Sequence, residues 1–328
     1  MAKGQQFQLI PPDNNLLCAD PHNADRYDTH ARFVIERHMV YLRRARGLDK
    51  PWTQDPVLLE NRFCNIYRQL DTVSIWIIDN IIRKYEDNPN LPVMLAMARL
   101  INWPDTLQEL IDEKVFPVQR WDWEKTYKVL EARKQRGDKV VTGAYIVNSI
   151  FPQGFDSSEL GNTKVHYIPR FGIDPLWAAR KELTKDMKVG MEHAVKKLST
   201  FHGWAAFMSY QVIVDLSYSE NWLAKAPDLN TFTSPGPGTR KGQQFLTTGV
   251  LGKSSSFVGV QEQMIAGREE ANRRIQELVP AKLWTGDFRT GFAPMEMSNY
   301  SNSLCEFSKW MSVSTGNGQM RASYRGKA

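Results

Sequence analysis

The sequence predicts a mostly α-helical protein, and three observations support this fold class. Apolar residues recur at steps of four and three between Leu59 and Ile77, which is the spacing of one helix face. The stretch 203–216 is apolar nearly all round, as in a helix that is buried on every side. Runs rich in β-branched residues are few and isolated. The 328 residues, 42% of them hydrophobic, can build one compact body or two lobes with a cleft between them.

The N-terminal part divides into three expected segments. Residues 1–29 are polar and turn-rich, so we expect an irregular lead-in. A helix over 30–46 is expected to end near Gly47. The prolines within 49–56 indicate a rigid connector, because each disfavours helical backbone in the residue before it.

The apolar stripe predicts one long helix over 59–85, stopping at the turn residues that follow. Periodicity predicts further helices over 92–101, 105–114, 122–136, 174–199, 203–216, 257–278 and 297–311. The stretch 140–155 fits either a strand or a buried turn, and 157–172 is expected to be a loop. We expect 30–311 to form the catalytic domain and 312–328 to be a flexible basic tail.

Cysteine usage and hydropathy narrow the class of protein. The three cysteines are far apart and odd in number, which does not suggest a disulfide framework and fits a reducing cytosol. Local Cys and His spacing offers no zinc motif. No run of about 18 apolar residues occurs, and the N-terminus lacks the apolar core of a secretory signal, so neither a membrane span nor export is expected.

Basic residues are clustered, although the net charge is only +6. Three acid-poor clusters stand out, comprising Arg43, Arg44 and Arg46, then Arg240 and Lys241, and finally Arg321, Arg325 and Lys327 in the tail. Any one of them is explained by a solvated surface. Together they favour a polyanionic partner such as nucleic acid.

Two glycine-rich stretches could bind phosphate, and the first is a chance near-miss. In 249–256 a lysine follows Gly252, but a Walker loop requires a glycine five positions before Gly252, where Thr247 stands. No buried strand leads into it. The stretch therefore gives no support to a nucleotide kinase.

The second stretch, 229–245, resembles the helix-hairpin-helix motif of DNA glycosylases. Pro235, Gly236, Gly238 and Gly242 match that motif, with Ser234 where leucine is usual, and Leu229 and Phe232 would lie on its first helix. Glycines let backbone N–H groups approach a DNA phosphate, and Arg240 and Lys241 would add charge. The alternative is an ordinary Pro-Gly loop.

The hydrolytic part of such glycosylases is missing from this sequence. They use an aspartate after the hairpin, but none occurs between Asp228 and Asp287. Lytic members add a lysine within the motif, where Arg240 stands, and a guanidinium stays protonated and is no nucleophile. The sequence therefore favours a related fold with other chemistry.

Three further stretches carry a more specific resemblance. They are "FVIERHMVYLRRARGLDKPWTQDPVLLENRFCNIYRQLDTV", "FMSYQVIVDLSYS" and "NYSNSLCEFSKW" followed by the basic tail. In this order, and with the hairpin, they resemble the phage α-glutamyl/putrescinyl thymine pyrophosphorylases, or amino acid:DNA transferases. A related helical domain accompanies 5-hydroxymethyluracil DNA kinases. The resemblance covers 30–85 and 200–311 and implies an all-α, glycosylase-like fold.

The resemblance implies phage DNA hypermodification. A kinase pyrophosphorylates 5-hydroxymethyl-deoxyuridine in DNA, and this class then displaces pyrophosphate with an amine. The implied partners are double-stranded phage DNA, an amino acid or polyamine, and an associated 5-hydroxymethyluracil DNA kinase, in the cytoplasm of the infected bacterium. No cofactor is assigned, and a divalent metal ion is left open.

A pyrophosphate leaving group needs cations where negative charge develops. Arg44 lies on the helix predicted over 30–46, together with Arg37, and Arg62 and Arg68 lie on the next one. We assign Arg44, Arg62 and Arg68 to the pyrophosphate. Surface ion pairs are the alternative for each of them.

The attacking amine must be neutral, so a carboxylate base is wanted nearby. Asp71, Asp215 and Glu306 are the candidates. Asp215 ends an apolar run, where burial raises a carboxylate pKa, although it could equally cap a helix or pair with a buried arginine. In the family an aspartate often follows the phenylalanine after Glu306, and Ser308 stands there instead.

The target base must leave the stack, and Tyr210 and Gln211 are the candidates for its pocket. An aromatic ring can stack on the base, and an amide can bind a uracil edge. Two other functions stay open, namely a DNA base glycosylase that uses an unmatched carboxylate and a non-catalytic DNA-binding helical module that assists the kinase.

Overall fold

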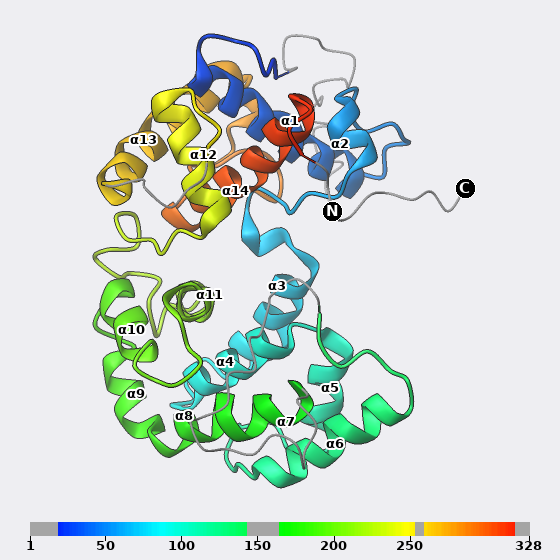
Figure 1. The fold of residues 1–328 in the computed structure, drawn as a ribbon, viewed down its shortest axis with the longest axis vertical. Coiled ribbons are helices and arrows are strands. Elements are labelled where there is room, and N and C mark those ends of the chain that lie inside the picture. Colours follow the sequence, from blue (N-terminus) through cyan, green and yellow to red (C-terminus); the bar gives the residue numbers. More distant parts are fainter. Residues whose placement is uncertain (1–18, 143–163, 253–258, 319–328) are drawn as a thin grey trace, which may run out of the picture. The chain divides into compact units, whose positions relative to one another are not determined.

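The computed structural model describes residues 19–142, 164–252 and 259–318. Within these ranges the chain is mostly helical, as predicted, and β-type pairing is limited to isolated bridges such as Trp284 with Phe292. The chain divides into two compact units (Figure 1). Unit 1 comprises Met1–Asp71 and Pro235–Ala328, and unit 2 comprises Thr72–Ser234.

Unit 1 is built from both ends of the chain. Its elements are α1 (Arg26–Ala45), α2 (Pro56–Glu60), η2 (Arg68–Leu70), α12 (Pro237–Thr248), α13 (Val260–Leu278), η6 (Ala281–Leu283) and α14 (Met297–Ser314). The lead-in predicted over 1–29 is wrong at its end, because Asp25 caps α1 by accepting from the Asp28 amide. The tail predicted from 312 is wrong at its start, because α14 continues to Ser314.

The core of unit 1 depends on close contact between α12 and α14. A Cβ atom added at Gly242 would lie 2.4 Å from the Leu304 carbonyl oxygen, and one added at Gly238 would lie 2.6 Å from the Cys305 Sγ. Only glycine allows the two helices to approach so closely. Phe307 of α14 packs on, among other aromatic side chains, Phe245 of α12.

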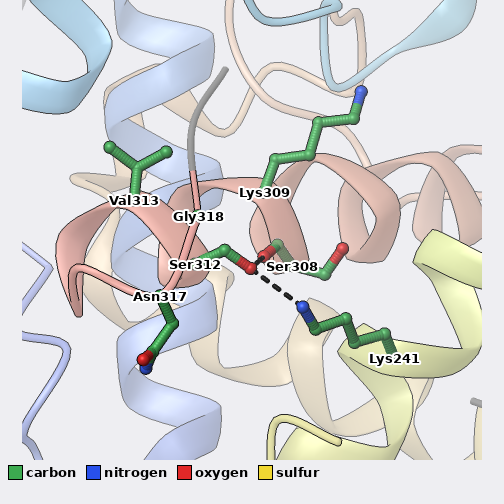
Figure 2. Close-up of a pocket in the computed structure, with 7 residues that line it drawn as sticks. All are labelled: Lys241, Ser308, Lys309, Ser312, Val313, Asn317 and Gly318. Carbon is green, nitrogen blue, oxygen red and sulfur yellow. Dashed lines mark hydrogen bonds between the residues drawn. The ribbon is translucent and has the colours of Figure 1, made fainter. Parts of the chain in front are cut away.

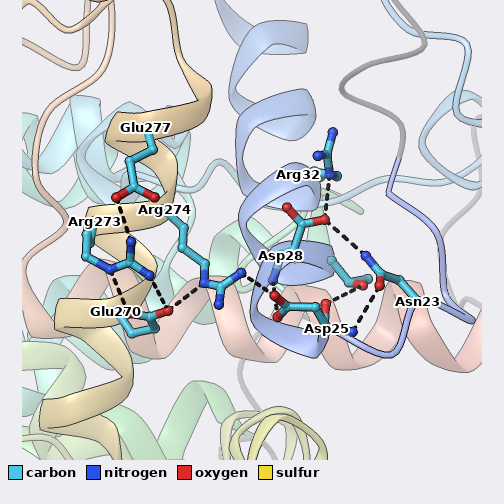
Figure 3. Close-up of polar contacts among 9 residues, drawn as sticks. Asn23, Asp25, Asp28, Arg32, Glu270, Arg273, Arg274 and Glu277 are labelled. Carbon is cyan, nitrogen blue, oxygen red and sulfur yellow. Dashed lines mark hydrogen bonds and ion pairs between the residues drawn. The ribbon is translucent and has the colours of Figure 1, made fainter.

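A network of ion pairs connects α13 to the start of α1 (Figure 3). Arg274 of α13 bridges Glu270 on its own helix and Asp25, the cap of α1. Arg273 also pairs with Glu270, and hydrogen bonds from the two arginines lower the Glu270 pKa to about 2. Because these groups are partly exposed, each pair contributes only about 0.2–1 kcal/mol.

The single helix predicted over 59–85 is wrong. Helix α2 ends at Glu60, an irregular stretch and η2 follow, and α3 (Thr72–Ile77) continues into the π-helical segment η3 (Ile78–Ile82). Most of the apolar stripe after Leu59, which is exposed, is nevertheless buried, because Ile66 lies in the core of unit 1 and Ile77 in the core of unit 2. Two separate cores therefore produce the periodicity that resembles one helix face.

Unit 2 contains the remaining helices. They are α3, η3, α4 (Leu91–Ile101), α5 (Pro104–Asp112), α6 (Trp123–Gln135), α7 (Lys164–Tyr167), η4 (Ile168–Ile173), α8 (Asp174–Ala178), α9 (Arg180–Asp186), α10 (Met191–Leu198) and α11 (Ala206–Leu216). The predicted helices that correspond to α4, α5, α6 and α11 are confirmed, as are α13 and α14 in unit 1. None of the described helices combines the length and the apolar character that a membrane crossing requires.

Two predictions in unit 2 are wrong. The helix predicted over 174–199 is divided into α8, α9 and α10, since the chain breaks near Ala179 and again at Gly190, which precedes α10. The loop predicted over 157–172 is helical from Lys164 onward. The prediction for 140–155 lies almost entirely outside the described residues.

Helices α4 and α11 form the centre of unit 2. Every residue of α4 is buried, including Arg99. Its guanidinium donates to both carboxylate oxygens of Asp215 on α11, at 2.5 Å each, and also to Ser74 and Asn102. The pair joins the two most apolar helices of unit 2 and satisfies its own charges.

Two buried histidines of α1 make the stability of unit 1 depend on pH. Burial lowers the pKa values of His30 and His38 to about 3 each, below an ordinary value of about 6.5. Between these values the unfolded chain binds protons that the folded chain does not, so the free energy of unfolding falls as the pH falls through this window. We expect His30→Phe to reduce that slope by up to about 1.4 kcal/mol per pH unit.

Urea denaturation at a series of pH values between 7 and about 4 measures this slope. Phenylalanine suits the site because His30 packs edge-on against Tyr300 and Phe307. His22→Gln is the control, since His22 is exposed. An unchanged slope in His30→Phe would show that His30 is not a source of the pH dependence.

Candidate functional site

The candidate site in unit 1 is built around the irregular segment 63–71. Two consecutive backbone amides of this segment donate to carboxylates. The Cys64 amide donates to Glu306 Oε2 at 3.1 Å, and the Asn65 amide donates to Asp71 Oδ1 at 2.9 Å. Glu306 comes from α14, whereas Asp71 ends the segment itself. The two carboxylates are therefore held at neighbouring peptide groups.

Arg37 of α1 holds the same segment from another side. Its Nη2 donates to the Phe63 carbonyl oxygen and to Asn65 Oδ1, at 2.9 Å each. The Asn65 side chain in turn donates to the Leu70 carbonyl oxygen at 2.8 Å. Arg37 is buried, so its charge is fixed beside the segment.

Two asparagines of α14 complete the support. The Arg68 amide donates to Asn299 Oδ1 at 2.9 Å, and Asn302 Nδ2 donates to the Asn65 carbonyl oxygen at 2.7 Å. Side chains from α1 and α14 thus replace the hydrogen bonds that a helix would have made here. This replacement explains why the predicted long helix is interrupted at this point.

Five ionisable side chains surround this segment, and we call them the carboxylate cluster: Arg37, Arg68, Asp71, Glu306 and Lys309. Burial raises the Asp71 pKa, and the adjacent Glu306 raises it further. The Asn65 amide, Arg68 and Arg37 act in the opposite direction without reversing the shift. Glu306 is buried and pairs with Lys309 Nζ at 2.5 Å.

The cluster can support acid–base chemistry on an anionic substrate. A carboxylate with a raised pKa accepts a proton more readily near neutral pH. The buried arginines stabilise negative charge that develops nearby. In the described ranges no three His, Cys, Asp or Glu side chains are grouped as a metal site.

The structure brings together three of the residues predicted for the site, namely Asp71, Glu306 and Arg68. Arg62 is exposed and lies directly before the segment. Arg44 is exposed on α1, with its guanidinium carbon 5.8 Å from the centre of the Trp52 ring. The roles assigned to Arg44 and Arg62 stay predictions.

The other predicted residues belong to α11 in unit 2. Asp215 pairs with a buried arginine, which was the structural alternative to a role as base, since both its oxygens accept from Arg99. Tyr210 is buried and packs edge-on against Phe232, and Gln211 is also buried. Their roles as base and base pocket stay predictions.

The expected first helix of the hairpin is wrong. Turns occupy 227–231, and extended chain leads to α12, so Leu229 and Phe232 lie outside any helix. Gly236 caps α12, and Gly238 contacts α14 as described above. Arg240 donates to the Pro235 carbonyl oxygen, and Lys241 donates to Ser312 Oγ at 3.0 Å.

Sequence reasoning did not assign four residues that build the site. They are Arg37, Asn299, Asn302 and Lys309. Only Lys309 had a local signal, because it lies three residues after Glu306 on one helix. The others act on backbone groups that are distant in sequence, which no spacing indicates.

The fold and the cluster define a mostly helical protein with a buried, cation-flanked carboxylate site. A family model described as "5-hmdU DNA kinase, helical domain" matches residues 24–320, and the chain belongs to this family. A protein of Bacillus phage SP10 named "5-hmdU DNA kinase" is 31% identical over 256 residues. That match covers 74% of this chain and 39% of the relative, so the chain spans about two fifths of it. No solved structure matches the chain.

Removing Arg37 should destabilise unit 1. Arg37→Ala leaves the Phe63 carbonyl and the Asn65 side chain without this donor, and we expect a loss of roughly 3 kcal/mol in the free energy of unfolding. Arg32→Ala on the same helix removes a partly exposed pair with Asp28 and should cost less than about 1 kcal/mol. Equal losses in the two variants, measured by urea denaturation, would show that Arg37 is not a structural support.

Proposed function

We propose that the chain is an enzyme of phage DNA thymine hypermodification. It transfers an amine onto 5-pyrophosphorylmethyl-deoxyuridine in DNA and releases pyrophosphate. Family membership supports a role on a 5-substituted deoxyuridine, since the family description and the phage relative both name 5-hmdU. The amine is an amino acid or a polyamine, and the DNA is prepared by a 5-hydroxymethyluracil DNA kinase.

One observation carries the proposal, namely the position of Asp71 beside Arg68 and Arg37. The carboxylate has a raised pKa, and two buried guanidinium groups act on it electrostatically. Displacement of pyrophosphate by an amine needs both a base and cations at one place. Glu306 is assigned a supporting role and not that of the base, because its two oxygens accept from the Cys64 amide and from Lys309.

The proposed reaction assigns each group a step. The amine nitrogen forms a bond to the methylene carbon, and the carbon–oxygen bond to pyrophosphate breaks, with its electron pair leaving on pyrophosphate. Asp71 accepts the proton that the amine loses. Arg68 and Arg37 stabilise the departing charge, with Arg62 at the adjoining exposed position, whether bond breaking precedes or accompanies attack.

Asp71→Asn should reduce amine transfer by about 100-fold or more, because a carboxamide cannot accept the proton. Its carbonyl can still accept from the Asn65 amide, so folding should be kept. The wild-type rate should rise with pH through the Asp71 pKa, which lies above the ordinary carboxylate value, and the variant should lose that rise. The assay incubates the modified DNA with a set of amines and analyses the digested nucleosides by mass spectrometry.

Asp79→Asn is the matched control, since Asp79 is a carboxylate of unit 2 that pairs with Arg83. A nucleoside heavier by the amine supports transfer. Detection of abasic sites or of free base would contradict amine transfer and indicate that the protein is a DNA base glycosylase. Full transfer activity of Asp71→Asn would show that Asp71 is not the general base.

A second function is favoured by one observation. The family is described as the helical domain of a kinase, and 61% of the SP10 relative lies outside the match, from the 39% that is covered. The chain would then be a DNA-binding module that presents the base to a kinase. Tight binding of the modified DNA with no new nucleoside for any amine would support this module.

A further inference from the structure

A pocket of about 300 Å³ opens on unit 1 between the end of α14 and α12 (Figure 2). Its lining residues are Lys241, Ser308, Lys309, Ser312, Val313, Asn317 and Gly318. The lining contains two lysines and no acidic residue. This composition favours an anionic occupant.

The ammonium group of Lys241 is held in place at this pocket. Its Nζ donates to Ser312 Oγ at 3.0 Å, and that hydroxyl donates in turn to the Ser308 carbonyl oxygen at 2.7 Å. Figure 2 shows Lys241 reaching from α12 toward Ser312 on α14. Ser312 thus accepts from the ammonium, which has three N–H donors and uses one of them here.

The second lysine is already neutralised. Lys309 Nζ pairs with Glu306 Oε1, and this pair raises the Lys309 pKa against the effect of burial. Among the residues that the structure describes, the pocket therefore offers about one positive charge without an acidic partner, which matches a singly charged phosphodiester better than pyrophosphate. Because Lys309 lines the pocket and binds Glu306, the pocket adjoins the carboxylate cluster.

We infer that this pocket binds one backbone phosphate of the DNA strand and so sets the strand beside Glu306. The inference rests on the proposed action on DNA. The sequence suggested that Lys241 adds charge to a phosphate site formed by the backbone amides of the glycine hairpin, whereas here the Lys241 side chain itself, held by Ser312, makes the contact. Arg240, which bonds the Pro235 carbonyl, is not part of the lining.

The test measures binding of a short, unmodified, fluorescein-labelled duplex at increasing KCl concentrations, and needs no catalytic activity. Lys241→Gln should weaken binding roughly fivefold and lower the salt slope by about one. Lys241→Arg should restore both. Lys282→Gln is the control, because Lys282 is an exposed lysine of the same unit.

Calorimetric titration with inorganic pyrophosphate forms the second arm, and Lys241→Gln should leave that binding unchanged. Loss of pyrophosphate binding with DNA affinity intact would assign the pocket to the leaving group and overturn the inference. Reduced stability with unchanged DNA affinity would also overturn it, leaving Lys241 as a cation at the end of α14. If Lys241→Gln lost amine transfer but its DNA binding kept the wild-type salt dependence, the phosphate subsite would be ruled out, whereas the proposed enzyme activity would not be.

Discussion

The structure of unit 1 depends on the pairing of the peptide groups in segment 63–71. Buried amide and carbonyl groups must find partners, and within this segment only the short 3-10 helix η2 supplies backbone partners, at its end. Arg37 of α1 and three residues of α14 provide partners instead, namely Asn299, Asn302 and Glu306. The segment is thereby fixed by helices from opposite ends of the chain, so its shape depends on both of them.

The same constraint places the ionisable groups. Glu306 lies at the segment because it accepts a hydrogen bond from the Cys64 amide, and Lys309 lies there because it pairs with Glu306. Asp71 ends the segment and closes it by binding the Asn65 amide, which leaves it beside Arg37 and Arg68. The side chains that support the backbone are therefore also the ones that could take part in acid–base chemistry. A backbone held by many side chains also keeps these groups in fixed positions, as a preorganised site requires.

Sequence patterns predicted most helices, and their failures have physical causes. Helices such as α4 and α11 are apolar and buried in one core, so periodicity identifies them. The stripe from Leu59 to Ile77 has the same periodicity, but its buried residues, such as Ile66 and Ile77, belong to two different cores. The glycines of α12 suggested a phosphate hairpin, whereas Gly242 is required by the closeness of α14. Of the site, Asp71, Glu306 and Arg68 were predictable by residue type, but the asparagines and Arg37 that hold them act through tertiary contacts alone.

The partly buried Asp71 and the buried Asp215 show that geometry distinguishes two residues of the same type. Asp71 and Asp215 were both candidates for the base, and only Asp215 ends an apolar run in the sequence. Asp215 binds one guanidinium through both oxygens at 2.5 Å, and neutralising it would leave Arg99 as an unpaired buried charge. Asp71 instead binds a neutral backbone amide through one oxygen and shares its surroundings with two arginines and a second carboxylate. A protonated Asp71 therefore leaves Arg37 hydrogen-bonded to the Phe63 carbonyl and to Asn65, so proton uptake costs less there than at Asp215.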